Sequence, residues 1–225
     1  MNIFSYESRF SQVFLKLSYA CCLNVMWFVC CLPIFTIGAS TAALYSATLK
    51  IADDRDRHIA QKFFSAFRTN FKQATRVWLI LLAVGILLGA DGYIAAHMRL
   101  TTPGPLAVMW TLNLALIIGA AVIFTIILIF IFPLIAWFEN TDAMMFKNAL
   151  LIGTHYLFCT ISVAAIHFAM FFAVVALFTP LILFGEGLCA LLSSYLIINV
   201  FRVISYRPEE EEEEEDEEEA EEAAK

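Results

Sequence analysis

The stretch LPIFTIGASTAALY, residues 32–45, decides how the first apolar part of this chain can fold. The apolar region around it covers residues 13–50. At about 1.5 Å per residue, one straight helix of that length would be nearly twice as long as the ~30 Å core of a bilayer is thick. The region must therefore break, and helices break most easily at proline and glycine. We predict the break at Pro33–Gly38, within a candidate packing or binding site made of Pro33, Thr36, Gly38, Ser40 and Thr41.

Composition assigns the chain to the membrane proteins. Hydrophobic residues make up 61% of the sequence, against ~45–50% in soluble domains, and phenylalanine alone occurs 21 times. Four further apolar runs approach or exceed the roughly 18 residues that mark a membrane-spanning helix. We therefore predict an all-α fold, a polytopic membrane helix bundle with five to six hydrophobic helical segments. The four further runs are residues 77–98, 106–138, 157–184 and 187–204.

Two arrangements fit the broken first region. In one, a span at 13–32 is followed by a turn at 33–37 and a short return helix at 37–50. In the other, an interfacial N-terminal helix leads into a single kinked span, which places the N-terminus outside. The break also has two interpretations, because irregular backbone at membrane depth must be satisfied by protein or by a water-filled cavity. Either its small side chains let helices pack closely, or it lines a substrate site as broken helices do in transporters.

The charged residues divide the chain into two parts. The formal net charge is −7, but 13 of the 21 acidic residues lie between positions 209 and 222. Such a run is too charged to collapse, so we predict a membrane-embedded domain at 1–207 and a disordered acidic cytoplasmic tail at 208–225. Basic residues concentrate in loop 50–76, which the positive-inside rule places in the cytoplasm together with the C-terminus. These basic residues are Lys50, Arg55, Arg57, Lys62, Arg68, Lys72 and Arg76.

An amphipathic segment precedes the second long apolar run. Aromatic side chains recur at three- and four-residue spacing over residues 58–79, with lysine and arginine between them. That pattern is typical of a helix lying in the headgroup plane, here predicted at about 58–76, and a groove on a partner protein can bind the same stripe. The candidate interfacial anchor residues are Phe64, Phe67, Phe71, Lys72 and Trp78.

Few polar groups fall at membrane depth, where the cost of burial makes them functional candidates. Asn113 and His167 are the candidate intramembrane polar residues, whereas we expect Asp91 and Glu186 near the outer surface. A proton relay needs carboxylates near the midplane, so this distribution argues against one. The sequence contains no nucleotide-binding loop, metal motif or nucleophile motif. We therefore expect no enzyme activity, no catalytic residue, no cofactor, no bound metal and no nucleic-acid partner.

Two stretches resemble the YesL-like proteins, a family of bacterial integral membrane proteins whose domain has no known function. They are NVMWFVCCLPIFTIGASTAALYSATLK at 24–50 and FFSAFRTNFKQATRVWLI at 63–80, and the later FPLIAWFENT and FKNALLIGTHYL fit the same pattern. The resemblance covers roughly residues 3–205 and leaves out the acidic tail. It implies the bacterial cytoplasmic membrane and an association with carbohydrate uptake, notably ABC-type, binding-protein-dependent transport of oligosaccharides. It implies no catalytic or binding residues.

Two functions fit these observations. We expect a non-enzymatic accessory or scaffold protein that contacts the lipid bilayer and binds ABC transporter permease subunits or a second copy of itself. The alternative is a small-solute transporter or channel with its site at the broken first helix. Convergence of His167, Asn113 and the break on one water-accessible cavity would favour the transporter.

Overall fold

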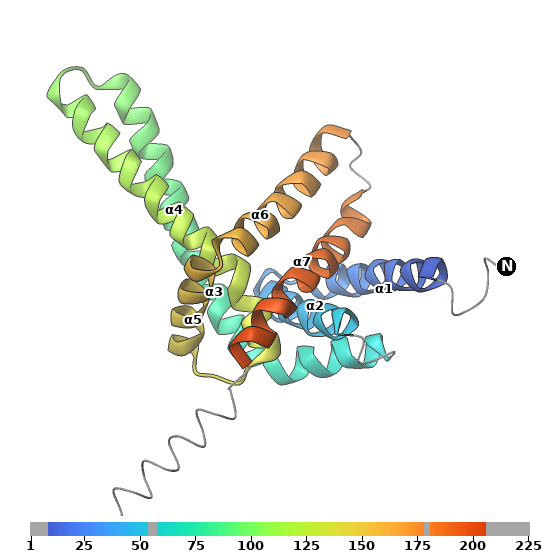
Figure 1. Ribbon diagram of the computed structural model, residues 1–225. Helices are drawn as coiled ribbons and strands as arrows, with labels where there is room; N and C mark the ends of the chain where they lie inside the picture. The colour runs from blue at the N-terminus through green and yellow to red at the C-terminus, as the bar shows by residue number, and fades with distance from the viewer. Residues whose placement is uncertain (1–8, 54–57, 178–180, 206–225) are drawn as a thin grey trace, which may run out of the picture.

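The computed structural model describes residues 9–53, 58–177 and 181–205, and these residues form helices with short connections (Figure 1). The prediction of an all-α fold is confirmed. The predicted acidic tail at 208–225 lies outside the described residues. The elements are α1 (Arg9–Cys30), the 3₁₀ turn η1 (Ile34–Thr36), α2 (Ile37–Ala52), α3 (Ile59–Thr101), α4 (Pro105–Trp137), α5 (Asp142–His155), α6 (Leu157–Phe172), the π turn η2 (Ala173–Leu177) and α7 (Ile182–Ser205).

Within the described residues, five helical segments are long and apolar enough to cross a membrane. The apolar part of α1, Leu15–Cys30, is shorter than these, so the span predicted at 13–32 is the weakest candidate for a crossing. The return helix predicted at 37–50 continues to residue 52 and, with the turn before it, reaches spanning length. The protein is thus a polytopic helical membrane protein. The five segments are 34–52, 59–101, 105–137, 157–176 and 184–205.

The first apolar region breaks around its proline. α1 ends at Cys30 and α2 begins at Ile37, so the break covers residues 31–36, and Gly38 already belongs to α2. Pro33 has extended backbone (φ −77°, ψ 120°) and precedes the 3₁₀ turn. The Thr36 hydroxyl lies 2.6 Å from the carbonyl oxygens of both Cys30 and Pro33, and its hydrogen satisfies backbone groups that the end of α1 leaves unpaired.

α2 lies in the centre of the bundle, where it packs against α1, α3, α4 and α7. Nearly all of its side chains are buried in protein, so it has no face that needs large apolar groups against lipid. Small side chains instead let four neighbouring helices approach its backbone. This placement explains the unusual composition of the opening stretch. The buried residues of α2 are Gly38, Ala39, Ser40, Ala42, Ala43, Leu44, Tyr45, Ser46, Ala47, Thr48, Leu49, Ile51 and Ala52.

α3 joins two segments that the sequence predicts separately. It runs without interruption from Ile59 to Thr101, so the amphipathic segment predicted at about 58–76 is its first part and not an independent helix. The reason is local, because no glycine or proline occurs between positions 59 and 84 to end the helix. In Figure 1 the turquoise first part runs along the base of the molecule and the green second part rises from it. Its position in the headgroup plane stays a prediction.

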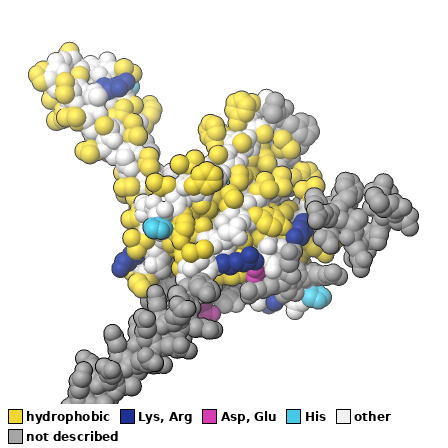
Figure 2. Space-filling model, viewed as in Figure 1, with side chains coloured by type: hydrophobic (Ala, Val, Ile, Leu, Met, Phe, Trp, Pro, Cys, Tyr) yellow, Lys and Arg dark blue, Asp and Glu magenta, His cyan; other side chains and the backbone are white. Residues whose placement is uncertain are grey.

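Two arms diverge from this core (Figure 1). The second half of α3 pairs with α4 to form the longer one, called here the α3–α4 arm, and α6 packs against α7 in the other. Large apolar side chains on both arms are exposed, among them Leu87 (70%), Leu116 (74%) and Phe158 (85%). In Figure 2, hydrophobic side chains cover the arms while most of the visible charged ones lie along the lower edge. Exposed apolar surface of this extent is covered by lipid or by a partner protein.

The charged lower edge ties several helix ends together. Arg202, near the end of α7, forms an ion pair with Asp53, the C-cap residue of α2. Arg76 of α3 pairs at 3.1 Å with Asp142 in the first turn of α5, a position that the helix dipole also favours for a carboxylate. The side-chain amide of Gln73 donates to the same carboxylate at 3.1 Å. The ends of α2 and α7 and the start of α5 therefore meet at one edge of the molecule.

Candidate functional site

A cleft lies where α2 meets the bases of the two arms. Its volume is about 540 Å³, within the range of roughly 300–1,000 Å³ that small-molecule sites occupy. Apolar and aromatic side chains form most of its walls, and a few hydroxyl groups and a histidine–glutamate pair supply polarity. We call it the central cleft. It is lined by Thr41, Tyr45, Trp78, Thr125, Leu128, Ile129, Phe132, Ala164, His167, Phe168, Phe171 and Glu186.

His167 on α6 and Glu186 on α7 form the polar pair of the central cleft. Nδ1 of His167 lies 2.9 Å from the carbonyl oxygen of Val163, which can only accept, so we assign the hydrogen to Nδ1. Nε2 then faces Glu186 Oε1 at 3.7 Å. If His167 were neutral and Glu186 ionised, two hydrogen-bond acceptors, Nε2 and Oε1, would face each other. The contact is therefore attractive only when one additional proton lies on the pair. The two side chains are 32% and 29% exposed and are therefore accessible from the cleft.

Two glycines that pack against other helices hold Glu186 in this position. A methyl group on Gly185 would lie 3.1 Å from the Met170 side chain of α6, and one on Gly187 would lie 2.9 Å from Cβ of Asn24 in α1. Asn24 Oδ1 also accepts the backbone N–H of Gly187 at 2.7 Å. Glu186 lies in α7, which begins at Ile182, and its carboxylate faces His167 of α6. The flanking glycines in FGEGL are the one local signal of this close packing.

Hydrogen bonds fix the α2 and α3 sides of the cleft. The indole N–H of Trp27 donates to Thr41 Oγ1 at 3.2 Å, so the Thr41 hydroxyl keeps its own hydrogen for another acceptor. The indole N–H of Trp78 donates to the Ile34 carbonyl in the broken segment at 2.8 Å. The ring of Trp78 packs at 6.4 Å from that of Phe132. Trp78, a predicted interfacial anchor, thus joins the break to the wall of the cleft.

The five candidate residues of the break have different surroundings. Thr41 lines the cleft, whereas Pro33 and Thr36 shape the turn before α2. A methyl group on Gly38 would collide with Cβ of Trp78 and lie 2.5 Å from the Ala74 carbonyl oxygen, so Gly38 permits close contact between α2 and α3. The Ser40 hydroxyl is buried beside the Cys31 thiol, which is a weak hydrogen-bonding group. Of the five candidate residues, only Thr41, in α2, therefore lines the cleft, and Gly38 lies in the packing contact between α2 and α3.

Most of the aromatic side chains in the first part of α3 pack against other residues of the protein. The ring of Phe67 lies 6.5 Å from that of Phe63, which is fully buried, and 5.5 Å from that of Phe71. Phe67 and Phe71 pack against the hydrophobic core, while Phe64 is 46% exposed and remains available to lipid. Lys72 is exposed on the same helix. The prediction that these residues anchor the protein at the membrane surface is not tested by these contacts.

Asn113 does not reach the central cleft. It lies in the α3–α4 arm, where its Nδ2 donates to Oδ1 of Asp91 at the long distance of 3.5 Å. Of the three features expected to converge in a transporter, His167 and the end of the break meet at the cleft, and Asn113 does not.

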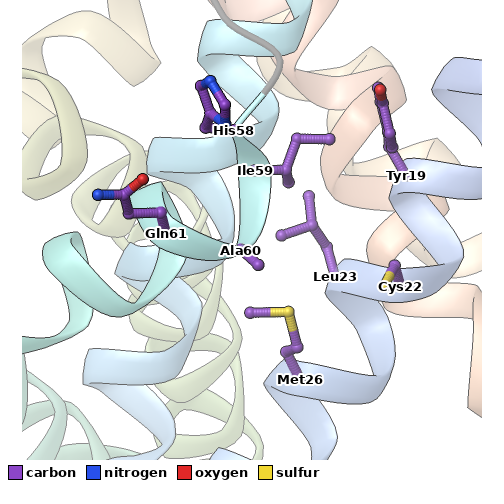
Figure 3. A pocket seen from close by; sticks show the side chains of 8 residues that line it. All are labelled: Tyr19, Cys22, Leu23, Met26, His58, Ile59, Ala60 and Gln61. Atoms are coloured by element: carbon purple, nitrogen blue, oxygen red, sulfur yellow. The ribbon is translucent and has the colours of Figure 1, made fainter.

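A second cavity, of about 390 Å³, separates α1 from the start of α3. Figure 3 shows Leu23 of α1 and Ile59 of α3 pointing toward each other across it, while Gln61 points away. It is an apolar packing groove between two helices and holds His58 at its rim. Within residues 9–53, 58–177 and 181–205, no group of three or more His, Cys, Asp or Glu side chains is placed to hold a metal ion.

The known proteins to which the chain is similar have no assigned function. The family model described as "Protein of unknown function, DUF624" matches residues 20–92. The uncharacterized protein YesL of Bacillus subtilis (strain 168) is 24% identical over 208 residues, which cover 91% of this chain and 93% of YesL. The uncharacterized protein YteU of the same organism is 24% identical over 165 residues, or 73% and 71% of the two chains. These matches support a YesL-like family. No solved structure matches the chain.

The part matched by the family model ends within the second half of α3. It includes the break and three residues of the central cleft, namely Thr41, Tyr45 and Trp78. His167 and Glu186 lie outside it, so the cleft is built from both the matched and the unmatched part of the chain.

Proposed function

We propose that the protein is a non-enzymatic accessory or scaffold component of the bacterial cytoplasmic membrane that assembles through its α3–α4 arm with another membrane protein. The resemblance to YesL-like proteins points to a permease subunit of an oligosaccharide uptake system as that partner. Self-association through the same arm is the alternative assembly. Both follow from the same feature, an arm that the rest of the chain leaves uncovered.

The observation that carries this proposal is the exposed carboxylate of Asp91. It lies ten residues before the end of α3 at Thr101, or roughly 15 Å along the helix, among exposed apolar side chains such as Leu87 and Ile94. A carboxylate among apolar side chains that lipid would cover is costly, and in membrane proteins such groups usually face protein or water. Its 3.5 Å bond from Asn113 is too long to offset that cost. A partner helix that donates a hydrogen bond to Asp91 would offset this cost.

The distribution of charge supports the proposed orientation. The ion pair between Arg202 and Asp53 brings the end of α7 and the residues after α2 to the same edge. This contact supports a position for loop 50–76 and the end of α7 on one side of the membrane, and the basic residues of that loop favour the cytoplasm. The tip of the α3–α4 arm, with Arg99, is at the opposite end.

The test is affinity purification of the full chain from native membranes in mild detergent, followed by mass spectrometry. We expect a stoichiometric partner, or a complex of twice the mass of the chain. The variant Asp91→Leu should lose this assembly while remaining folded. Glu139→Leu, which removes an exposed carboxylate from the connection between α4 and α5, should retain it. Recovery of wild-type protein as a monomer without a partner would refute the assembly role.

The central cleft favours a second candidate function, that of a small-solute transporter. Here the broken helix contributes Thr41 to a cavity that also holds His167 and Glu186. Reconstitution of the purified chain in liposomes and measurement of solute flux test this candidate directly. Flux that disappears in Glu186→Gln would support it, and absence of flux across a panel of sugars, amines and ions would refute it.

A further inference from the structure

The central cleft has the chemistry of a site for a particular class of ligand. Glu186 is the acidic group among its lining residues, and the aromatic rings of Trp78, Phe132 and Phe168 form much of the wall. Aromatic faces attract cations, and a carboxylate adds a full opposite charge. Apolar walls of this size accept apolar substituents, which suits a cation that carries hydrophobic groups.

The groups around Glu186 decide what balances its charge. His167 faces it from α6, Tyr45 lies on α2, and the thiols of Cys31 and Cys189 are the other titratable groups near it. The lining residues from α3 and α4 are uncharged. Phenol and thiol groups become anions when they ionise, so protonated His167 is the positive group that the cleft itself provides. A bound cation would therefore balance the charge of Glu186 in place of the proton on the His167–Glu186 pair.

We propose that the central cleft binds a hydrophobic organic monocation, whose charge takes the place of the proton held by the His167–Glu186 pair. A cation beside Glu186 repels the imidazolium, so the proton leaves Nε2 for bulk water. His167 then remains as a neutral ring that still donates from Nδ1 to Val163. An anion would meet Glu186 directly and be repelled. This inference goes beyond the accessory role and does not depend on it.

The experiment uses tetraphenylphosphonium as the probe and the full chain in mild detergent. Isothermal titration calorimetry should show one site. Over the pH range in which the pair holds its proton, the Kd should fall about tenfold for each unit by which the pH is raised. Titrations in two buffers of different ionisation enthalpy should show about one proton released per cation bound. This measurement needs no variant, so it stays decisive even if a substitution in the cleft disturbs folding.

Two comparisons isolate the charge. Glu186→Gln should weaken binding of tetraphenylphosphonium about tenfold or more, whereas Glu139→Gln, at an exposed carboxylate away from the cleft, should bind as the wild type does. Triphenylphosphine oxide, a neutral molecule with similar phenyl groups, should bind far more weakly than the cation. The proposal is overturned if tetraphenylphosphonium does not bind, if it binds without proton release, or if the neutral probe or the Glu186→Gln variant binds equally well.

Discussion

Replacing Gly38 with alanine should destabilise the protein even though alanine is the better helix former. The added methyl group would collide with Cβ of Trp78 and lie 2.5 Å from the Ala74 carbonyl oxygen. Both atoms belong to the rigid part of α3, so relief requires the two helices to move apart. Overpacking of this kind costs about 1–3 kcal/mol, and the gain in helix propensity is at most ~1 kcal/mol. We therefore expect the free energy of unfolding to fall by about 1–2 kcal/mol.

The matched control is Gly89→Ala in the second half of α3. Nothing lies within 4 Å of a methyl group at Gly89, so only the gain in helix propensity applies, and stability should rise by up to ~1 kcal/mol. Both variants can be unfolded with SDS in mixed micelles while tryptophan fluorescence is followed. If Gly38→Ala unfolds at the same SDS fraction as the wild type, or at a higher one, the close contact between α2 and α3 is wrong.

Buried polar groups in the core give further expectations for the same SDS titration. Thr48→Val and Ser194→Ala each remove one end of a 2.8 Å hydrogen bond between α2 and α7, and each should cost about 1 kcal/mol, with the double variant costing less than the sum. Asn24→Ala deprives an α7 backbone N–H of its acceptor and should cost about 1–3 kcal/mol. Ser40→Ala should instead change stability by less than ~1 kcal/mol, because the Cys31 thiol is a weak partner for this buried hydroxyl, and a larger loss of stability would show a stronger hydrogen bond. Truncation at Pro208 should leave a folded, monodisperse protein in size-exclusion chromatography.

Composition and the positions of proline and glycine predict much of the fold. The number of apolar helical segments, the break after α1 and the extent of α2 follow from them, with α2 reaching residue 52 where the pattern predicts 50. The continuity of α3 does not follow. Its apolar pattern changes from one-sided to all-round near position 77, which looks like a boundary, but no helix-breaking residue accompanies the change. A change of periodicity marks a change of environment and leaves the helix intact.

The sequence predicts the site only in part. Thr41, Trp78 and His167 are singled out by pattern or by polarity, and all three line the central cleft. Glu186 is expected only near the outer surface, and its contact with His167 of α6 is not predicted by any pattern. Tyr45 gives no local signal, since an aromatic residue in an apolar helix looks like ordinary packing. The meeting of α6 with α7 is a tertiary event that no short pattern encodes.

The bundle reverses the arrangement of a soluble protein, and this reversal explains why the site is difficult to find from hydropathy. Many large apolar side chains face outward on the α3–α4 arm and on α6, while the least apolar of the five spanning segments, 34–52, lies enclosed at the centre. A polar residue on an outward face, such as Asp91, is the basis of the proposed assembly with a partner. A polar residue beside the central helix, such as His167 or Glu186, is instead a sign of an internal site. Hydropathy reports how deep a residue lies along its helix, and that depth does not distinguish Asp91 from Glu186. The direction in which each side chain faces does distinguish them, and it separates the proposed assembly surface from the central cleft.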